Sequence, residues 1–492
     1  MTLKKVGVIA CLFLLSFSAK STDLIWKFDP ELQKAYQLII NLQPEKANEI
    51  LAKSRSNELH KLYLQSLNET IHILITEDHE GFIKVDQNFK ERLKYIESLP
   101  QNAETLFLQA EITLQRGFCY LNLNQEINAV FAIRKAYQLT LDCMKKYPSF
   151  APIKKTSGVI QVMVGSVPEK YQWFVSLLGM KGSVTTGQKQ LTELRNSGSS
   201  LSLEATMLFY TVKGFLNQQF AEAAQGINLC LKDQPNNKLL LFIGVNMLIK
   251  DGRSEEALAL IHDIDSSPGS LPVHYIDYLH AEILLQKGEY SKSIELYHKF
   301  IKNFPSPSFK KDSYFKISLC YWLLDDTKSA RANFEKAKMT GSDKAEPDRY
   351  AAKQLEDTTL PNKKLLKVRF STDGGYYKEA ANVLSSITPK DLTSVKDQTE
   401  YYYRKARLAH RTGEIAAAKI FYQQSIDMTR DNPWYFGANS ALQLGYIAKD
   451  QKNYDAAKKY FYMALNYPKH EYKNSIDSKA RTELQLLGET KV

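Results

Sequence analysis

The sequence predicts an all-α fold, a right-handed superhelical solenoid built from stacked helix pairs. A pattern of small and large apolar residues recurs between residues 201 and 468. Glycine and proline are sparse, 22 and 16 in 492 residues, whereas a β-sandwich needs many more turns. Apolar residues make up 44% of the chain and charged residues 24%, which is ordinary for a folded protein. Because one helix pair cannot bury its own apolar face, we expect the pairs to fold together as an array.

The clearest copy of the pattern spans residues 438–468. Its positions are Leu444-Gly445, then Tyr454, Ala457, Phe461 and Ala464. Small residues stand where two helices touch closely, and large apolar residues stand where one helix inserts into the next. This arrangement resembles the tetratricopeptide repeat.

Six further segments align on the turn between two helices, where glycine, an acidic residue and an aromatic residue are typical. They are residues 202–235, 238–264, 274–305, 311–337, 361–387 and 399–425. The array at 201–468 therefore holds about seven units. Residues 345–355 are predicted to form an extra helix before the unit at 361, and residues 469–492 a C-terminal capping helix. Residues 24–150 are predicted to form a less regular set of helix pairs.

The first residues indicate an export signal. Lys4 and Lys5 precede an apolar run over residues 6–15, and small residues follow it. The run is shorter than the roughly 20 residues that span a bilayer. We expect residues 1–20 to be a signal peptide cleaved near residues 18–21. The mature chain would then have no membrane span and be periplasmic or membrane-associated outside the cytoplasm. Lipidation of Cys11 is left open.

Residues 151–200 do not follow the repeat, and we treat them as a separate helical segment. Pro168 is expected to begin a helix that Gly179 and Gly182 end. The string Val167-Pro168-Glu169-Lys170, then Leu177-Leu178-Gly179-Met180-Lys181-Gly182, Gly187 and Leu191 resembles the central signature of the tetratricopeptide repeat protein 39 family, which includes fungal inclusion-body clearance proteins. The resemblance implies an all-helical repeat fold without catalytic residues. Since members of that family are intracellular eukaryotic proteins, the export signal indicates an exported bacterial relative.

No pattern of residues predicts catalysis, a cofactor or a metal. The sequence has no G-x-S-x-G or H-E-x-x-H motif, and no C-x-x-C pair. His274, Asp277 and His280 recur every three residues, but they occupy ordinary first-helix positions of a repeat. Lysines and arginines are mixed with acids, so a nucleic-acid site is not expected despite the net charge of +11. Cys119 and Cys143 could form a disulfide if their helices are neighbours.

The remaining candidate is the concave surface of the array. In such repeats the first helix of each pair lines that surface through its second, fifth, ninth, twelfth and thirteenth positions. The candidate residues are Tyr403, Arg407, His410, Arg411, Tyr446, Lys449, Arg369, Tyr278 and Trp322. Tyrosine and arginine suit a peptide with acidic and aromatic side chains.

We therefore expect a non-catalytic protein–protein interaction scaffold or adaptor outside the cytoplasm that binds a peptide or helix in the concave groove. The alternative is a glycan- or nutrient-capture envelope lipoprotein that uses the repeat helices as a frame. It requires a lipidated Cys11 and long irregular loops, whereas the loops here are short. The partner and the oligomeric state are not specified by the sequence.

Overall fold

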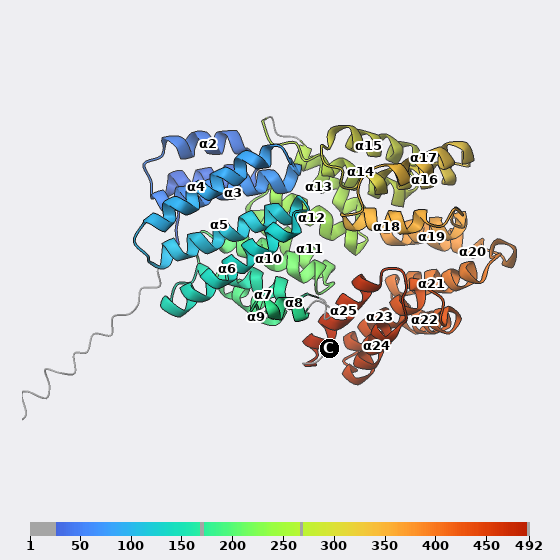
Figure 1. The fold of residues 1–492 in the computed structure, drawn as a ribbon. Coiled ribbons are helices and arrows are strands. Elements are labelled where there is room, and N and C mark those ends of the chain that lie inside the picture. The colour runs from blue at the N-terminus through green and yellow to red at the C-terminus, as the bar shows by residue number, and fades with distance from the viewer. Residues whose placement is uncertain (1–25, 168–171, 266–268, 490–492) are drawn as a thin grey trace, which may run out of the picture.

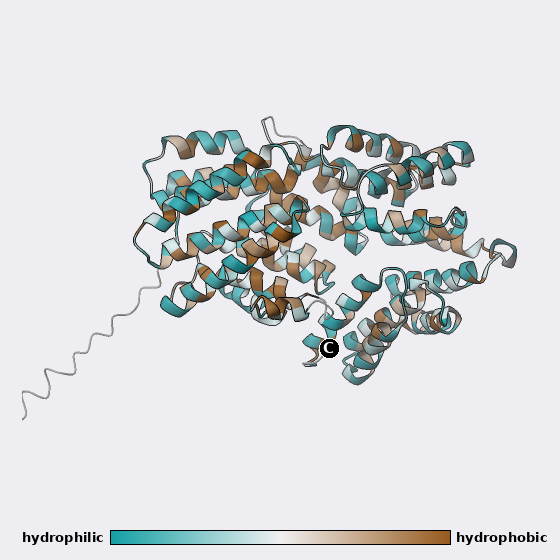
Figure 2. Ribbon diagram, in the orientation of Figure 1, coloured by the Kyte–Doolittle hydropathy of each residue, from teal (hydrophilic) through white to brown (hydrophobic). Residues whose placement is uncertain are grey.

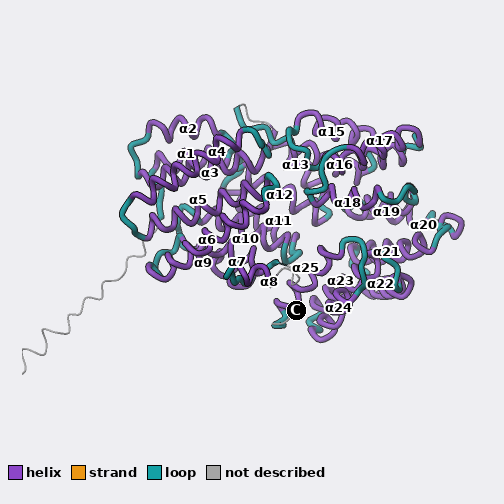
Figure 3. Tube along the Cα trace, viewed as in Figure 1, coloured by secondary structure: helices purple, strands orange, loops and turns teal. Residues whose placement is uncertain are grey.

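A computed structural model describes residues 26–167, 172–265 and 269–489. Within these ranges every regular element is a helix, so the fold is the all-α helical-repeat solenoid that the sequence predicts. Consecutive helices pair antiparallel and the pairs stack side by side (Figure 1), joined by short loops (Figure 3). Apolar residues gather where helices pack on one another (Figure 2). The predicted signal peptide, residues 1–20, lies outside the described residues.

Three helix hairpins form the N-terminal region. Their helices are α1 (Pro30–Ile40), α2 (Pro44–Lys53), α3 (Glu58–Thr76), α4 (Gly81–Ser98), α5 (Ala103–Asn122) and α6 (Glu126–Lys146). Asp29 caps α1 by accepting a hydrogen bond from the Leu32 amide. Asn102 and Thr105 begin α5 with a reciprocal capping box whose two hydrogen bonds are 2.9 Å long. The apolar faces of these helices meet in one core.

The segment that carries the family signature forms α7 (Ile153–Gly165), α8 (Gln172–Leu177) and α9 (Val184–Arg195). Helices α7 and α9 pack through glycines. A Cβ atom on Gly187 would lie only 2.4 Å from the carbonyl oxygen of Gly158, so this close approach requires glycine. Pro168 lies outside the described residues, and α8 is followed by Gly179 in a left-handed conformation with φ +70°.

Four hairpins form a middle arm. Their helices are α10 (Ser202–Phe215), α11 (Phe220–Asp233), α12 (Lys238–Asp251), α13 (Ser254–Asp265), α14 (Tyr275–Lys287), α15 (Tyr290–Asn303), α16 (Lys310–Leu323) and α17 (Thr327–Met339). The small and large repeat positions are buried together. Ala330 and Phe334 of α17, for example, are 0% and 1% exposed.

The chain turns back after α17. Helix α18 (Glu346–Leu355), at the place of the expected extra helix, packs on α16. The carboxylate of Asp348 accepts hydrogen bonds from the amides of Phe309, at 2.6 Å, and Asp312, at 2.9 Å. Asp348 thereby caps the N-terminus of α16 from a neighbouring helix and fixes α18 in place.

The remaining helices form a C-terminal arm. They are α19 (Lys363–Gly374), α20 (Tyr377–Ser385), the short 3-10 helix η2 (Pro389–Asp391), α21 (Val395–Arg411), α22 (Ile415–Thr429), α23 (Tyr435–Asp450), α24 (Tyr454–Asn466) and α25 (Lys473–Leu486). Helix α19 packs against α14 rather than on α17, so this arm does not continue the stack of the middle arm in line. Instead, the two arms lie next to each other (Figure 1).

The turn between α12 and α13 meets the turn between α19 and α20. A Cβ atom on Gly375 would lie 1.9 Å from the carbonyl oxygen of Gly252, so the two backbones are in direct contact. The Tyr376 hydroxyl donates a hydrogen bond of 2.8 Å to Glu255. We call this contact, residues 251–255 against residues 374–376, the arm junction.

The N-terminal region packs along the middle arm through its inter-helix turns. The Leu271 amide donates to the Leu42 carbonyl at 2.7 Å, and the Ser306 hydroxyl donates to Glu77. Lys344 lies 3.4 Å from the Asn124 carbonyl oxygen. Successive turns of the N-terminal hairpins therefore contact successive loops that precede α14, α16 and α18.

A buried ionic network joins α3, α5, α7 and α10. Lys155 Nζ lies 2.8 Å from Glu111 and 2.6 Å from Glu204, and the Tyr63 hydroxyl donates to Glu204 at 2.7 Å. All four residues are buried. Burial favours the neutral amine, but the two glutamates outweigh it, and the pKa of Lys155 is raised.

Candidate functional site

Helix α21 presents a row of basic side chains at consecutive turns. Ser394 caps the helix by accepting a hydrogen bond from the Asp397 amide. The row is Arg404, Arg407 and Arg411, at spacings of three and four residues, which places these side chains on one side of the helix. The partners of the three arginines differ along the row.

Arg404 is held in place by contacts within the C-terminal arm. Its guanidinium donates to Glu400 at 2.7 and 2.9 Å and to the Tyr435 hydroxyl at 2.9 Å, and the residue is 5% exposed. Tyr403 is also buried, packs on Phe436 and accepts a hydrogen bond of 2.6 Å from Asn439. These two residues therefore stabilise the contact between α21 and α23.

Arg407 and Arg411 are held more loosely. The nearest acid to Arg407 is Asp373, at 3.9 Å, and the nearest acid to Arg411 is Asp251 of the middle arm, also at 3.9 Å. Arg407 donates to Gln443 at 3.2 Å, and Arg411 donates to the Lys250 carbonyl at 3.4 Å. Within the described ranges, neither guanidinium makes the short bidentate pair with a carboxylate that gives the strongest ion pairs.

Arg369 of α19 shares one acid with this row. Its Nε lies 3.9 Å from Asp373, and its side chain is 37% exposed. Asp373 thus lies between Arg369 and Arg407 without a short hydrogen bond to either. His410 lies 3.2 Å from the Tyr422 hydroxyl; burial, together with the charges of Arg407 and Arg411, lowers its pKa to about 4. His410 is therefore neutral at physiological pH.

Two candidates on α23 contact the last two helices of the chain. Lys449 pairs with Glu483 of α25, a residue 1% exposed, and the Tyr446 ring packs on Phe461 with ring centres 5.7 Å apart. Burial raises the pKa of Glu483 although the neighbouring Lys449 opposes the shift. In the last unit the first-helix surface is therefore covered by α25.

The two candidates of the middle arm also contact other parts of the chain. Tyr278 is 4% exposed, and its hydroxyl donates to Asp312 at 2.7 Å. Trp322 donates from Nε1 to the Pro361 carbonyl at 2.8 Å, and Lys363 lies over its ring. Trp322 thus joins the middle arm to the segment that folds back on it, whereas Tyr278 contacts the next unit of the same arm.

The nine candidate residues thus fall into three places. Arg369, Arg407, His410 and Arg411 lie together where the C-terminal arm approaches the middle arm. Tyr403, Tyr446 and Lys449 make contacts inside the C-terminal arm, and Tyr278 and Trp322 contact the middle arm and the returning chain. Sequence spacing found Arg407 and Arg411 of the arginine row, but it indicated neither Arg404 nor the nearby Lys250 and Asp251. These two come from a helix about 160 positions earlier.

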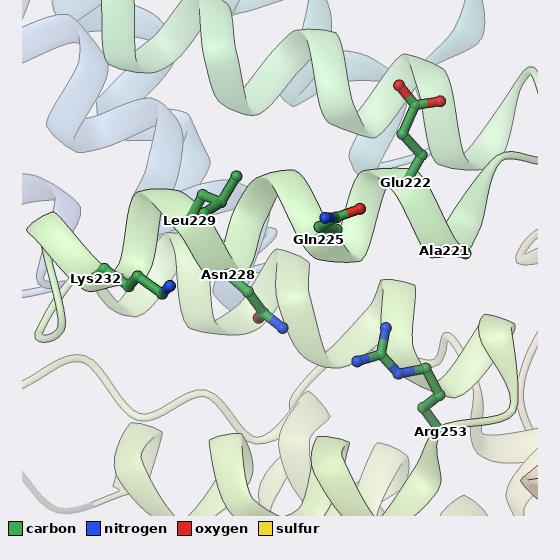
Figure 4. A pocket seen from close by; sticks show the side chains of 7 residues that line it. All are labelled: Ala221, Glu222, Gln225, Asn228, Leu229, Lys232 and Arg253. Carbon is green, nitrogen blue, oxygen red and sulfur yellow. The ribbon is translucent and has the colours of Figure 1, made fainter.

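A surface hollow lies on a different part of the molecule. It has a volume of 680 Å³ along α11 and the start of α13, and Figure 4 shows its lining side chains. Glu222 is paired with Lys213, and Arg253 donates to Glu256 at 2.7 Å. Two of the three charged side chains that line the hollow, Glu222 and Arg253, thus already have partners in the protein, and no sequence motif indicated the hollow.

Neither a disulfide nor a metal site occurs among the residues that the structure describes. Cys119 and Cys143 are both buried and free, so they do not form the disulfide that was left open, although α5 and α6 pack together. Burial raises the pKa of each thiol to about 12, so neither is a thiolate at neutral pH. No group of three histidine, cysteine or acidic residues in the described ranges has a metal-binding arrangement. Among the same residues, no helix combines the length and apolar character of a membrane span.

The chain contains tetratricopeptide repeats. Models described as tetratricopeptide repeat match residues 276–307, 311–339, 399–432 and 438–468. The first two matches cover α14 to α17, and the last two cover α21 to α24. No curated protein matches the chain.

Solved structures of low overall similarity include repeat proteins with different ligands. A human IFIT1 dimer with PPP-AAAA is 14% identical, with a TM-score of 0.32, over 90% of this chain and 96% of that one. The apo quorum sensor NprR from B. thuringiensis is 11% identical, with a TM-score of 0.30, over 81% and 98%. A Rap protein complexed with competence and sporulation factor is 10% identical, with a TM-score of 0.25, over 92% and 98%. Sequence identities and TM-scores this low carry no information on what this chain binds.

Proposed function

We propose that the protein is a non-catalytic interaction scaffold that binds a peptide or helix of a partner protein at the first-helix surface of the C-terminal arm. One observation carries the proposal. Arg369, Arg407 and Arg411 lie side by side, partly exposed, and none of them makes a short ion pair with any residue that the structure describes. Partly desolvated guanidinium groups with unused donors are favourable anchors for a protein ligand.

The repeat architecture supports the same role. Arg407 and Arg411 lie within the tetratricopeptide match at residues 399–432, and further matches lie before and after it. Such units form a stack of first helices that presents side chains in a regular order. The rest of the stack supplies rigidity, because each helix pair is packed between neighbours. A rigid surface loses little conformational entropy on binding, which favours affinity.

We also propose that the protein acts outside the cytoplasm. Lys4, Lys5 and the apolar run over residues 6–15 support an export signal. A distant relation to the tetratricopeptide repeat protein 39 family belongs to the same proposal. It is supported by the signature glycine Gly187, which packs closely against Gly158 of α7.

The test is chemical cross-linking in intact cells, followed by purification of the tagged protein and mass spectrometry. We expect a stoichiometric envelope protein to be recovered with the wild-type chain and lost with Arg407→Glu/Arg411→Glu. The matched control is Lys145→Glu/Lys328→Glu, which makes the same charge change on α6 and α17. Retention of the partner by a folded Arg407→Glu/Arg411→Glu variant would refute the site. Recovery of the chain alone in several growth conditions would refute the scaffold and favour capture of a small ligand.

A further inference from the structure

A second, polar hollow of 420 Å³ lies along α1 of the N-terminal region. Its walls come from four segments: the residues before α1, α1 itself, the segment that joins α9 to α10, and the residue after α11. Two hydrogen bonds of 2.9 Å hold these walls together, from the Phe28 amide to Ser200 Oγ and from the Ser200 amide to the Trp26 carbonyl. A volume of 420 Å³ lies within the range of small-molecule sites.

Amide side chains with unused hydrogen-bonding groups line this hollow. Gln33 and Gln37 lie one turn apart on α1, and neither side chain is hydrogen-bonded to another residue that the structure describes. Gln234 accepts from Asn237 at 3.2 Å, which leaves its NH2 group available. Lys27 is the one charged side chain in the lining, and no acid of the described residues belongs to it. The lining therefore matches a polar ligand that is not a cation.

Tyr36, between these two glutamines in the sequence of α1, also lines the hollow. The residue is 1% exposed, and its hydroxyl has no hydrogen-bond partner among the residues that the structure describes. Burial raises the pKa of Tyr36, so the hydroxyl keeps its proton and can donate. An unpaired buried hydroxyl destabilises a fold, and an acceptor atom brought by a ligand removes that penalty.

We propose that this hollow binds a neutral saccharide of one or two rings. The inference goes beyond the proposed function, because it assigns a different ligand to a site outside the C-terminal arm. A sugar hydroxyl both donates and accepts, as do a glutamine amide and a serine hydroxyl, so Gln33, Gln37 and Ser200 can pair with neighbouring hydroxyls of the ligand. Phe28 and Leu203 supply the apolar part of the lining, on which the C–H face of a sugar ring can pack.

The experiment titrates the full chain with maltose, cellobiose and N,N′-diacetylchitobiose, followed by ligand-observed NMR. The titration extends to about 10 mM, because sites built on a few neutral hydrogen bonds bind in the millimolar range. We expect saturable binding of at least one disaccharide, with little dependence on salt. Gln33→Leu and Gln37→Leu should each weaken it about fivefold, the effect of one neutral hydrogen bond. The matched control, Gln225→Leu in the hollow on α11, should leave it unchanged.

Tyr36→Phe separates binding from packing. Because the hydroxyl has no partner among the described residues, its removal should leave the melting temperature unchanged or raise it. Saccharide binding should nevertheless weaken about fivefold in the same variant. In the wild-type chain, hydrogen exchange at the Ser200 amide should slow when the saccharide binds, since that amide belongs to the wall of the hollow.

Several outcomes would overturn the inference. Absence of saturable binding by all three disaccharides, or equal weakening in Gln225→Leu, removes the site. A melting temperature lowered by Tyr36→Phe shows that the hydroxyl has a partner in the protein and removes the argument for a ligand there. Tighter binding of tetraglycine, lost in Gln33→Leu and Gln37→Leu, assigns the hollow to a peptide instead. None of these results affects the arginine cluster, which is tested by partner capture in cells, so the two proposals fail separately.

Discussion

The buried network around Lys155 gives the sharpest prediction on stability. Lys155→Met removes the one cation that lies between Glu111 and Glu204, and it leaves two buried carboxylates without a counter-charge. Breaking a buried ion pair from one side typically costs about 3–5 kcal/mol. Each glutamate keeps neutral hydrogen bonds, from Tyr63 to Glu204 and from Thr156 to Glu111, so we expect the loss to stay within that range.

The neighbouring lysine supplies a matched control. Lys154 lies 2.9 Å from Glu193, but these side chains are 35% and 40% exposed. Exposed pairs contribute about 0–1 kcal/mol, so Lys154→Met should change stability by no more than that. The same chemical change at adjacent positions thus separates the effect of burial from the effect of losing a lysine.

The measurement is urea unfolding followed by far-ultraviolet circular dichroism, with hydrogen exchange of the α7 amides as a local readout. The local readout matters because a stacked array does not always unfold in one step. Adding Glu111→Gln and Glu204→Gln to Lys155→Met should recover part of the lost stability, since the uncompensated charges are then gone. A cost for Lys155→Met as small as that for Lys154→Met, or no recovery in the triple variant, would refute the reasoning.

Three further predictions concern single residues. Gly375→Ala forces a Cβ atom against the Gly252 carbonyl and should open the arm junction, seen as a larger radius of gyration in solution scattering. Gly413→Ala has similar backbone strain in open space, and an equal effect there would contradict the steric argument. Burial raises the pKa of Asp348 from 3.8 to about 7, so between these pH values the folded chain holds a proton that the unfolded chain has lost. Stability should therefore fall as pH rises through this range. Asp348→Asn should flatten that slope in thermal melts. Cys119, with its pKa raised to about 12 by burial, should react with iodoacetamide at pH 8 only after denaturation, and rapid labelling of the native chain would be inconsistent with its position.

Local patterns were sufficient to predict the helices and their pairing. The repeat positions Ala457 and Phe461 follow a helical period, and both are fully buried against neighbouring helices. The glycine at 375 predicted a turn, and the turn has φ +86° there. These features depend on residues a few positions apart, which is the range over which helical periodicity operates.

The return of the C-terminal arm to the middle arm could not be predicted from such local patterns. It depends on contacts such as Gly375 with Gly252 and Arg411 with Asp251, which join residues more than a hundred positions apart. No period in the sequence encodes such pairs. For the same reason the helix register placed Tyr278 and Lys449 on the first-helix surface, but it could not show that other segments of the chain contact them.

The turns that join the N-terminal hairpins to the middle arm have a consequence for biosynthesis. Glu77 and Ser306 are 229 positions apart, and Asn124 and Lys344 are 220 apart. The first hairpins therefore leave the ribosome well before the loops that contact them have been translated. Since open repeat arrays can fold locally as they emerge, this chain differs in having to wait for distant partners. During that interval the turns of the early hairpins lack the contacts that they make in the folded chain. We expect holdase chaperones to bind the nascent chain there.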